Sequence, residues 1–447
     1  MPAPSSPLKA VRGTRDLLPP ETALWARIEQ VVRQVFARYG FGEIRTPIFE
    51  ATELFARGVG EETDIVSKEM YTWEDRARAQ SEKAQSLTLR PENTAGVVRA
   101  YIEHKLGESG ALQKLFYIGP QFRRERPQRG RYRQFWQIGC EVLGPPTSGS
   151  ESPIRDAEVL EMLATLLDEL GVKNWQLALN SVGSAEDRKR YNAALREALA
   201  PVKHQLSEDN QRRAETNPLR VLDSKEPADQ AIIDALPKIA DYLDESSRAH
   251  FAAVLSALDA CGVPYTVNPR LVRGLDYYTR TTFEFTVPSS DDPASGLGTQ
   301  NALLGGGRYD GLSEMLGGPK APGIGFAIGE DRLVLTLQAQ ASTAVNAPHP
   351  EALWVPKLDA YIAPMGVERN TAALALARKL RRAGLSVEVG DGSFRLKKSF
   401  EAADKIARHI VILGEDELAT NTATVKTFAT GEQVKIDRAD LASKLRA

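Results

Sequence analysis

Cysteine and long apolar runs are scarce in this sequence of 447 residues. Its two cysteines, Cys140 and Cys261, stand among apolar residues, so we expect reduced, buried thiols rather than a disulfide or a metal site. The N-terminal segment lacks the apolar core of a signal peptide, and no run of 18 or more apolar residues occurs. These absences predict a cytoplasmic protein that is neither secreted nor inserted into a membrane.

An excess of one charge is also absent, because 57 basic residues face 59 acidic residues and the net charge is −2. A nucleic-acid partner would therefore have to be bound by local basic patches rather than by a basic protein as a whole. The length and a hydrophobic content of 42% are those of a globular protein with two or three domains.

Residues 114–143 predict a long antiparallel hairpin of two half-buried strands. At the strand period of two, Phe116 and Ile118 fall on an apolar face, whereas Tyr117, Gln121 and Arg123 fall on the opposite face. The second arm repeats this alternation, and its polar face carries Gln137, Gly139 and Glu141. Gly139 leaves space on that face, so we expect a ligand to lie there.

The loop of this hairpin carries six arginines and one glutamate between positions 123 and 133. Guanidinium groups suit phosphate oxygens. The alternative is a solvated basic tip, which is the usual interpretation of a charge run. The alternation places Arg123 on the same face as Gln137 and Glu141, and this favours a functional role.

Residues 86–104 predict a strand that stops at Pro91 and a helix that begins near Thr94. Glu92 and Thr94 then lie at the junction, where both are also ordinary helix-capping residues. Further along, residues 270–287 read as a loop running into a strand, with Arg273 and Gly274 ahead of Tyr277 and Tyr278. The arginine could approach an anion closely, and the tyrosines supply hydroxyls and flat walls.

Two glycine-containing segments follow. Residues 302–318 contain a glycine triplet that matches no phosphate-binding loop, because neither a Walker lysine nor GxGxxG spacing accompanies it. Residues 322–335 predict a strand feeding a helix with Arg332 in its first turn. A cation there opposes the helix dipole, so a bound anion would explain it better than a structural role.

The remaining chain is organised around these segments. Residues 22–39 predict an amphipathic helix, which by default packs within its own chain. Residues 184–260 predict a helical insertion, in which His204 and His250 lack a nearby Cys or carboxylate partner and are expected to be exposed or structural. Residues 358–447 predict a small α/β domain whose helix presents Lys397 and Lys398 outward.

These motifs resemble those of the class II aminoacyl-tRNA synthetases, and specifically the histidyl-tRNA synthetases of bacterial type. The helix 22–39 and the segment after it, which contains Pro47, resemble motif 1. Residues 114–143 resemble motif 2, and residues 322–335 resemble motif 3. Residues 273–278 and the segment around the glycine triplet resemble the two histidyl signatures, the second of which is expected to form a turn lining the histidine pocket.

The resemblance implies an α+β fold with a catalytic domain on an antiparallel sheet. It divides the chain into a first catalytic part (1–183), a helical insertion (184–262), a second catalytic part (263–337), a linker (338–357) and an anticodon-binding domain (358–447). It also implies a homodimer. Its reaction would attach L-histidine to tRNA(His) through a histidyl-adenylate, with ATP and Mg²⁺ as substrate and no tightly bound prosthetic group or protein-held metal.

The resemblance also implies roles for individual residues. Catalysis would fall to Arg123 and Arg273, which face the α-phosphate and the carboxylate. The histidine-binding residues would be Glu92, Thr94, Arg123, Gln137, Glu141, Arg273, Tyr277 and Tyr278, and the ATP-binding residues would be Arg123, Glu125, Arg131, Phe135 and Arg332. The alternative is a non-catalytic, histidine-binding regulatory paralogue of ATP phosphoribosyltransferase. That paralogue usually lacks the C-terminal domain and intact signatures, so residues 358–447 and Arg273 argue against it.

Overall fold

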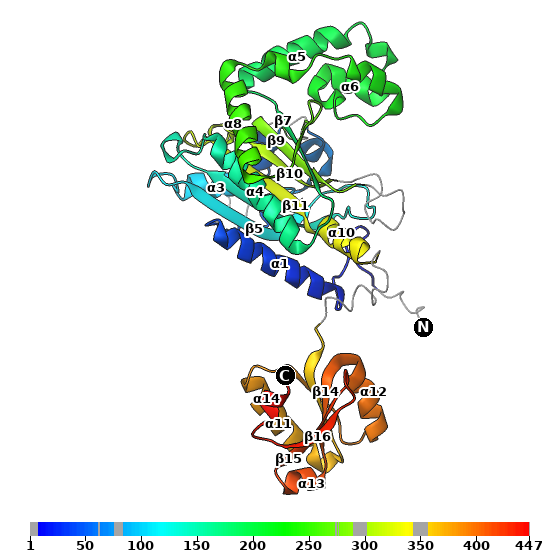
Figure 1. Ribbon diagram of the computed structural model, residues 1–447. Coiled ribbons are helices and arrows are strands. Elements are labelled where there is room, and N and C mark those ends of the chain that lie inside the picture. Colours follow the sequence, from blue (N-terminus) through cyan, green and yellow to red (C-terminus); the bar gives the residue numbers. More distant parts are fainter. Residues whose placement is uncertain are drawn as a thin grey trace, which may run out of the picture. The chain divides into compact units, whose positions relative to one another are not determined.

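A computed structural model describes residues 8–60, 63–75, 84–272, 275, 277–288, 302–342 and 356–446. The chain forms two compact units, Met1–Glu351 and Ala352–Ala447. Both units combine helices with sheets, which confirms the predicted α+β class (Figure 1). Among the described helices, none combines the length and the apolar character needed to cross a bilayer.

An eight-stranded sheet forms the centre of the first unit, in the order β1-β5-β6-β11-β10-β9-β7-β8. The pairs from β5 to β7 are antiparallel, and only the edge pairs β1–β5 and β7–β8 are parallel. This order places the predicted motif strands next to one another. The strands are β1 (Gly42–Glu43), β5 (Gln113–Phe122), β6 (Gln134–Leu143), β7 (Gln176–Ser181), β8 (Thr266–Val267), β9 (Thr279–Thr286), β10 (Ala302–Arg308) and β11 (Gly323–Gly329).

Four long helices cover one face of this sheet (Figure 1). They are α1 (Glu21–Arg38), α4 (Pro153–Leu170), α8 (Glu245–Cys261) and α10 (Glu330–Ser342). The apolar stripe of α1 is buried here, and the Phe36 ring lies 5.4 Å from that of Phe116 and 6.0 Å from that of Phe326. The predicted helix 22–39 is therefore confirmed, and its stripe packs inside its own chain.

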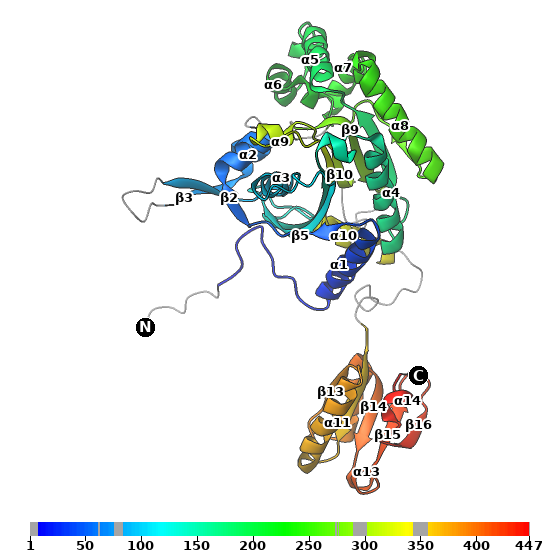
Figure 2. The same cartoon turned by 90° about the vertical axis from the view of Figure 1, so that its left-hand side faces the viewer.

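The opposite face of the sheet curves around α3 (Thr94–Glu103), as Figure 2 shows. Beside α3 lie α2 (Thr52–Val59), α9 (Leu312–Met315) and a three-stranded sheet of β2 (Phe49–Ala51), β4 (Gln85–Leu89) and β3 (Tyr71–Asp75). The prediction of a strand ending before Pro91 and a helix from Thr94 is confirmed.

The predicted hairpin is present, with Ile118 opposite Ile138, but its burial differs from the expectation. We expected an open polar face, whereas Gln121 and Glu141 are completely buried on it. The residues expected on the apolar face are in part less buried, since Ile118 and Phe122 are only half-buried. A period of two identifies which side chains share a face but does not tell what covers that face.

The insertion between β7 and β8 is helical, as predicted. Its helices are α5 (Ala185–Leu199), α6 (Glu208–Thr216), α7 (Gln230–Asp234) and α8. A capping box formed by Ser184 and Asp187 starts α5. Tyr191, Leu195, Val221 and Ile233 belong to an apolar core within the insertion. The last helix, α8, packs instead on α4 and β9, and its final residue, Cys261, is exposed rather than buried as expected.

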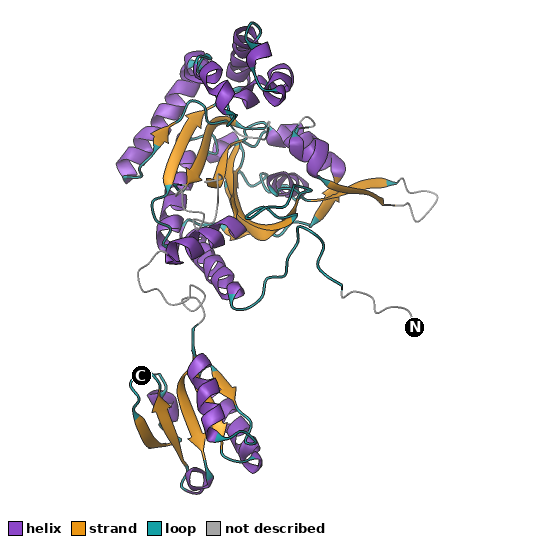
Figure 3. Cartoon of the chain, turned by 90° about the vertical axis from the view of Figure 1, so that its right-hand side faces the viewer, coloured by secondary structure: helices purple, strands orange, loops and turns teal. Residues whose placement is uncertain are grey.

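The second unit is the predicted small α/β domain (Figure 3). Its sheet has the order β13-β12-β14-β15-β16, with parallel pairs on both sides of β12 and an antiparallel hairpin at the end. The elements are β12 (Leu358–Pro364), α11 (Asn370–Arg382), β13 (Val387–Val389), α12 (Leu396–Ile406), β14 (Ala407–Leu413), α13 (Glu415–Ala419), β15 (Thr422–Thr427), β16 (Gln433–Asp437) and α14 (Leu441–Lys444).

The expected linker 338–357 and the glycine triplet 305–307 differ from the prediction. Because α10 continues to Ser342, the first five residues of the expected linker 338–357 are helical. The glycine triplet 305–307 is wrongly predicted as a turn, since it lies in the middle of β10. The domain boundaries themselves stay predictions.

Candidate active site

A cavity of about 590 Å³ lies in the first unit, on the sheet face that carries α3. Strands β5, β6, β9, β10 and β11, the start of α3 and the start of α10 all contribute to its wall. Ten of the twelve predicted site residues line it together: Glu92, Thr94, Arg123, Glu125, Arg131, Phe135, Gln137, Tyr277, Tyr278 and Arg332.

Glu92 and Thr94 form the wall at the N-terminus of α3. The Glu92 carboxylate accepts hydrogen bonds from the backbone N–H groups of Thr94 at 2.7 Å and Ala95 at 3.0 Å. Burial raises the pKa of Glu92 although these hydrogen bonds oppose the shift. Glu92 is therefore a helix cap, as the alternative interpretation held. Each carboxylate oxygen has a second lone pair, so a cap can also accept from a bound ammonium group.

Glu141 lies behind this wall, near the C-terminal end of β6, and is completely buried. Its Oε1 accepts from the Thr94 hydroxyl at 2.7 Å, whereas Oε2 makes no hydrogen bond to any described residue. Burial raises the pKa of Glu141 to about 8, while Thr94 and Tyr309 oppose the shift and Glu92 adds to it. This pKa lies near neutral pH, so the carboxyl group can donate a hydrogen bond when protonated and accept one when ionised.

Gly325 on β11 pairs with Glu141 on β6. Gly325 lines the cavity, whereas Glu141 does not. A Cβ atom at this position would lie 1.9 Å from Oε2 of Glu141, so a side chain here would displace the carboxyl group. Glycine is therefore required at this position for the Glu141 carboxyl group to keep its place beside the cavity wall.

Tyr277 and Tyr278 form an aromatic wall next to these carboxyl groups. Their rings lie 4.7 Å apart, and Tyr277 packs edge-on against Tyr309 at 6.0 Å. All three tyrosines are buried and line the cavity. Flat rings that are fixed by mutual packing suit a planar ligand group.

The other end of the cavity is cationic. The Arg123 Nε donates to the carbonyl of Pro91 at 2.9 Å, and its guanidinium lies 5.2 Å from the centre of the Phe135 ring. Glu125 pairs with Arg131 at 3.4 Å and with Arg123 at 3.7 Å. These ion pairs are partly exposed, so an incoming anion can compete for the arginines.

Arg332 joins this group from the first turn of α10. Its Nη1 donates to the carbonyl of Ala302 at 3.0 Å. Burial and the positive charge of Arg131 lower the pKa of Arg332, although Glu125 and Glu284 oppose the shift. Burial of Arg332 next to another arginine disfavours its positive charge, and a bound polyanion would offset this effect.

Among the described residues, no group of three or more His, Cys, Asp or Glu side chains is arranged to hold a metal ion. Arg273 lies outside the described residues, so the structure does not place it. Of the twelve predicted site residues, it is the only one without a position here.

The sequence interpretation did not identify several residues that line the cavity. Tyr117 and Glu284 fall on strand positions that face it, and the alternation of Phe283 and Phe285 around Glu284 was a usable signal. The insertion was expected to lack a catalytic constellation, yet it contributes Asp223 and Lys225 to the lining. No local pattern indicated that these two residues fold back over the sheet.

Comparison with known proteins gives one consistent family. A family model described as histidyl-tRNA synthetase matches residues 13–333, and one described as anticodon binding domain matches residues 359–447. A histidine–tRNA ligase of Koribacter versatilis is 68% identical over 98% of this chain and 96% of its own length. One of Solibacter usitatus is 53% identical over 98% and 99%. The crystal structure of apo S. aureus histidyl-tRNA synthetase, 38% identical, matches with a TM-score of 0.77 over 98% of this chain and 100% of that chain.

Proposed function

This chain belongs to the histidyl-tRNA synthetase family, and from this we propose how its cavity carries out the family's reaction. The enzyme is a histidine–tRNA ligase that attaches histidine to tRNA(His). The regulatory paralogue of ATP phosphoribosyltransferase is not favoured, because the full-length curated relatives are ligases and residues 359–447 match an anticodon-binding domain.

We propose that histidine binds at the tyrosine end of the cavity. Glu92, Thr94 and Gln137 would accept from its ammonium group, and all three line the cavity within reach of the α3 N-terminus. The imidazole would lie against Tyr277 and Tyr278 and would share a hydrogen bond with Oε2 of Glu141. That oxygen is supported as the partner because it is buried and lacks any other among the described residues.

ATP would occupy the cationic end. The adenine ring would stack on Phe135, and its amino group would donate a hydrogen bond to Glu125. Arg131 and Arg332 would hold the terminal phosphates. Mg²⁺ would enter with ATP as part of the substrate, since phosphate oxygens are the hard oxygen donors it prefers.

The two substrates would react where the ends of the cavity meet, at Arg123. A carboxylate oxygen of histidine attacks the α-phosphorus of ATP, and the bond to the bridging oxygen breaks as diphosphate leaves. Arg123 and Arg273 would stabilise the negative charge that develops on the α-phosphate. A ribose hydroxyl of the terminal tRNA nucleotide then attacks the histidyl carbonyl carbon, and AMP leaves. The enzyme's contribution is to position the reactants and stabilise charge.

The observation that carries this proposal is the juxtaposition, in one cavity, of a buried carboxyl group beside tyrosines and of three arginines. The test is exchange of labelled diphosphate into ATP. We expect exchange that requires histidine, is not supported by other amino acids, and is abolished by Arg273→Ala. Exchange without histidine, or with several amino acids at equal rates, would contradict the proposal.

We further propose a cytoplasmic homodimer that contacts tRNA(His) through the second unit. The apolar stripe of α1 is buried within the chain. Three other apolar side chains are exposed, namely Ile48 just before β2, Phe49 on β2 and Trp73 on β3, and the Phe49 and Trp73 rings lie 6.0 Å apart. Burying such a patch against a second copy would be favourable. Sedimentation equilibrium tests this, and a Phe49→Glu, Trp73→Glu variant should be monomeric.

A further inference from the structure

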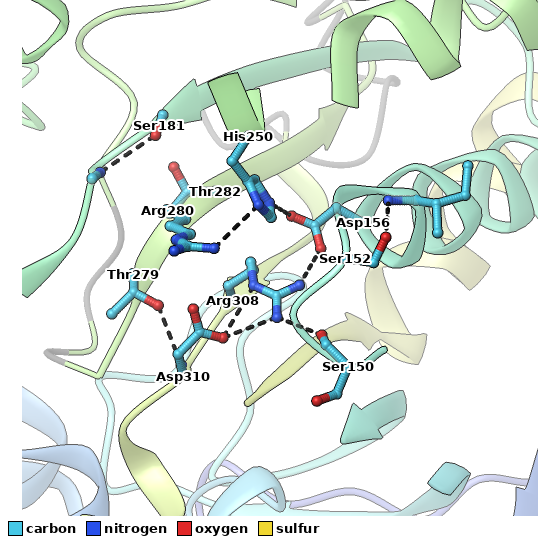
Figure 4. Close-up of polar contacts among 12 residues, drawn as sticks. Ser150, Ser152, Asp156, Ser181, His250, Thr279, Arg280, Thr282, Arg308 and Asp310 are labelled. Atoms are coloured by element: carbon cyan, nitrogen blue, oxygen red, sulfur yellow. Dashed lines mark hydrogen bonds and ion pairs between the residues drawn. The ribbon is translucent and has the colours of Figure 1, made fainter. Parts of the chain in front are cut away.

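A polar cluster with a buried centre joins α4, α8, β9 and β10 (Figure 4). It consists of Asp156 on α4, His250 on α8, Arg280 on β9, Arg308 on β10 and Asp310, which follows β10. None of these five side chains lines the cavity, so the proposed substrate contacts do not explain them.

Arg308 and Asp156 form the centre of the cluster, and both side chains are fully buried. Arg308 Nη1 donates to Asp156 Oδ1 at 2.5 Å, Nη2 donates to the carbonyl of Ser150 at 2.6 Å, and Nε donates to Asp310 Oδ1 at 3.1 Å. Burial alone would raise the pKa of Asp156, but Arg308 and His250 outweigh it and hold the pKa below its ordinary value. The pair is therefore ionised inside the protein, and its geometry is fixed by hydrogen bonds on several sides.

His250 extends this cluster to the helical insertion. Its Nε2 lies 2.8 Å from Asp156 Oδ2, and its Nδ1 lies 3.3 Å from Arg280 Nη1. A guanidinium can only donate, so Nδ1 accepts and Nε2 carries the proton that it donates to Asp156. One neutral tautomer therefore satisfies both partners. His250 is therefore buried and structural, one of the two expected outcomes, and its carboxylate partner lies 94 residues away in the sequence.

Arg280 occupies an irregular position in β9. It has a φ of 49°, which is unfavourable for a residue with a Cβ atom. The register explains this position, because Gly307 pairs with Thr282 whereas Arg308 pairs with Thr279, so that Arg280 and Thr281 form a bulge. Bulges beside active sites re-aim neighbouring side chains. The backbone of Arg280 is hydrogen-bonded to Val182 and Gly183 at 2.7 Å each, and its side chain contacts His250.

The bulge adjoins Tyr278 of the tyrosine wall, and Arg308 adjoins Tyr309, which packs against Tyr277. Arg308 lies between Tyr309 and Gly307, and a Cβ at Gly307 would lie 2.8 Å from the Tyr278 ring. The backbone N–H of Asp310 donates to the Thr279 hydroxyl at 3.2 Å, directly after Tyr278. The cluster thus fixes the backbone on each side of Tyr278 and Tyr309.

We propose that His250 is a positioning residue for histidine binding: through Asp156 and Arg280 it holds the β9 bulge and β10, and so sets the spacing of the tyrosine wall. This inference rests on the proposed placement of the imidazole against Tyr277 and Tyr278. It assigns a role in amino-acid binding to the last helix of the insertion, which itself does not reach the histidine pocket.

The first experiment measures diphosphate exchange by the full chain carrying single substitutions of His250. We expect His250→Ala to raise the KM for histidine at least fivefold and to leave the KM for ATP within twofold. His250→Gln keeps one donor and one acceptor and should restore the KM for histidine to within twofold of the wild type. An equal rise of both KM values, or no rescue by glutamine, would overturn the proposal.

The matched control is Ser247→Ala, one turn earlier on α8. The Ser247 hydroxyl is buried and donates to Asp187 at 2.6 Å, so this change also removes a buried hydrogen bond to a carboxylate from the same helix. It has no contact with the cluster, and we expect both KM values to stay unchanged. A rise in the KM for histidine equal to that of His250→Ala would show a general effect of loosening α8 and would overturn the proposal.

Arg280→Gly keeps the test decisive should His250→Ala fail to fold. Glycine adopts a positive φ without strain, so the melting temperature should stay the same or rise. The contact with His250 is lost, so the KM for histidine should still rise severalfold. An unchanged KM for histidine in a stable variant overturns the positioning role alone, whereas exchange by the wild type without histidine would contradict the proposed function.

Discussion

The two ends of the cavity differ in how completely they are assembled without a ligand. At the amino-acid end, Glu92, Thr94 and Glu141 are buried and already hydrogen-bonded to one another or to the backbone, and three tyrosines pack around them. At the nucleotide end, Arg131 and Glu125 form partly exposed ion pairs. The first arrangement is rigid and specific, and the second is adaptable and held by charge.

This difference reflects what each end has to recognise. A pocket that must select one amino acid gains discrimination from fixed polar groups, which are left unpaired when the wrong ligand enters. A polyphosphate is recognised by its charge, and positive groups can rearrange around it at small cost. Selectivity for histidine should therefore depend on geometry, and use of ATP should depend on the number of cations.

The largest effect should come from Arg123, where the two ends meet. Arg123→Ala should lower the rate constant for exchange by about 10²- to 10³-fold, the usual loss when one preorganised charge contact to the transition state is removed. Arg124→Ala is the control, because this neighbouring arginine is exposed and its guanidinium lies over Tyr71 rather than in the cavity. Equal rates for the two variants would show that Arg123 serves only the fold.

Glu141→Gln should break the amino-acid end selectively. Loss of a hydrogen bond that can carry charge costs about 1.5–3 kcal/mol, so we expect the KM for histidine to rise about 10- to 100-fold. The KM for ATP should change little, because the cationic end is untouched. Measured KM values that rise together would mean that the two ends are not independent.

Without substrates, the ionisation of Glu141 should be visible in how the free energy of unfolding depends on pH. The pKa of Glu141 is about 8 in the folded protein against an ordinary value of 4.5, so the folded state binds the additional proton between these values. The free energy of unfolding should therefore decrease as the pH rises from about 4.5 to about 8. The shift sets a limit of about 5 kcal/mol, and we expect a decrease of about 1–2 kcal/mol because relaxation reduces the cost of burying charge.

Urea unfolding of the wild type and of two variants tests this expectation. Glu141→Gln should flatten the decrease. Glu330→Gln is a matched control, since Glu330 is equally buried with its pKa raised to about 9 but does not line the cavity. It should flatten the decrease without changing the KM for histidine. A decrease that is identical in all three proteins would contradict the pKa assignments.

The smallest effect on exchange should follow removal of the second unit. Deletion of residues 343–447 retains α10 and the Gln340 side chain, which bonds to the backbone of Lys173 at 2.9 Å and 3.0 Å. Both ends of the cavity remain, so we expect exchange within threefold of the wild type. Charging of tRNA(His) should fall by about 10²-fold or more, because distant phosphate contacts are lost. A truncated protein that charges tRNA fully would refute the role proposed for this unit.

Local pattern was sufficient for the strands and helices that hold the site. The twelve site residues were expected from the resemblance to a family, and ten of them line one cavity. The errors arose where the outcome depended on distant partners. The polar hairpin face was expected to be open, yet α3 covers it. The carboxylate partner of His250 was not predicted, because Asp156 approaches it from another helix. Cys261 has apolar neighbours in sequence, but it is the last residue of α8 and is exposed there.

The glycines of β6, β10 and β11 limit how this enzyme can change by mutation. A Cβ at Gly139, Gly306 or Gly325 would lie 1.9–2.3 Å from existing atoms, including the Tyr117 hydroxyl and Oε2 of Glu141. Neighbouring atoms leave no space for a side chain at these positions. Every substitution there must therefore displace neighbouring atoms of the sheet. Single mutations that broaden the choice of amino acid are therefore expected in the tyrosines and in Thr94, where a side chain can still be made smaller.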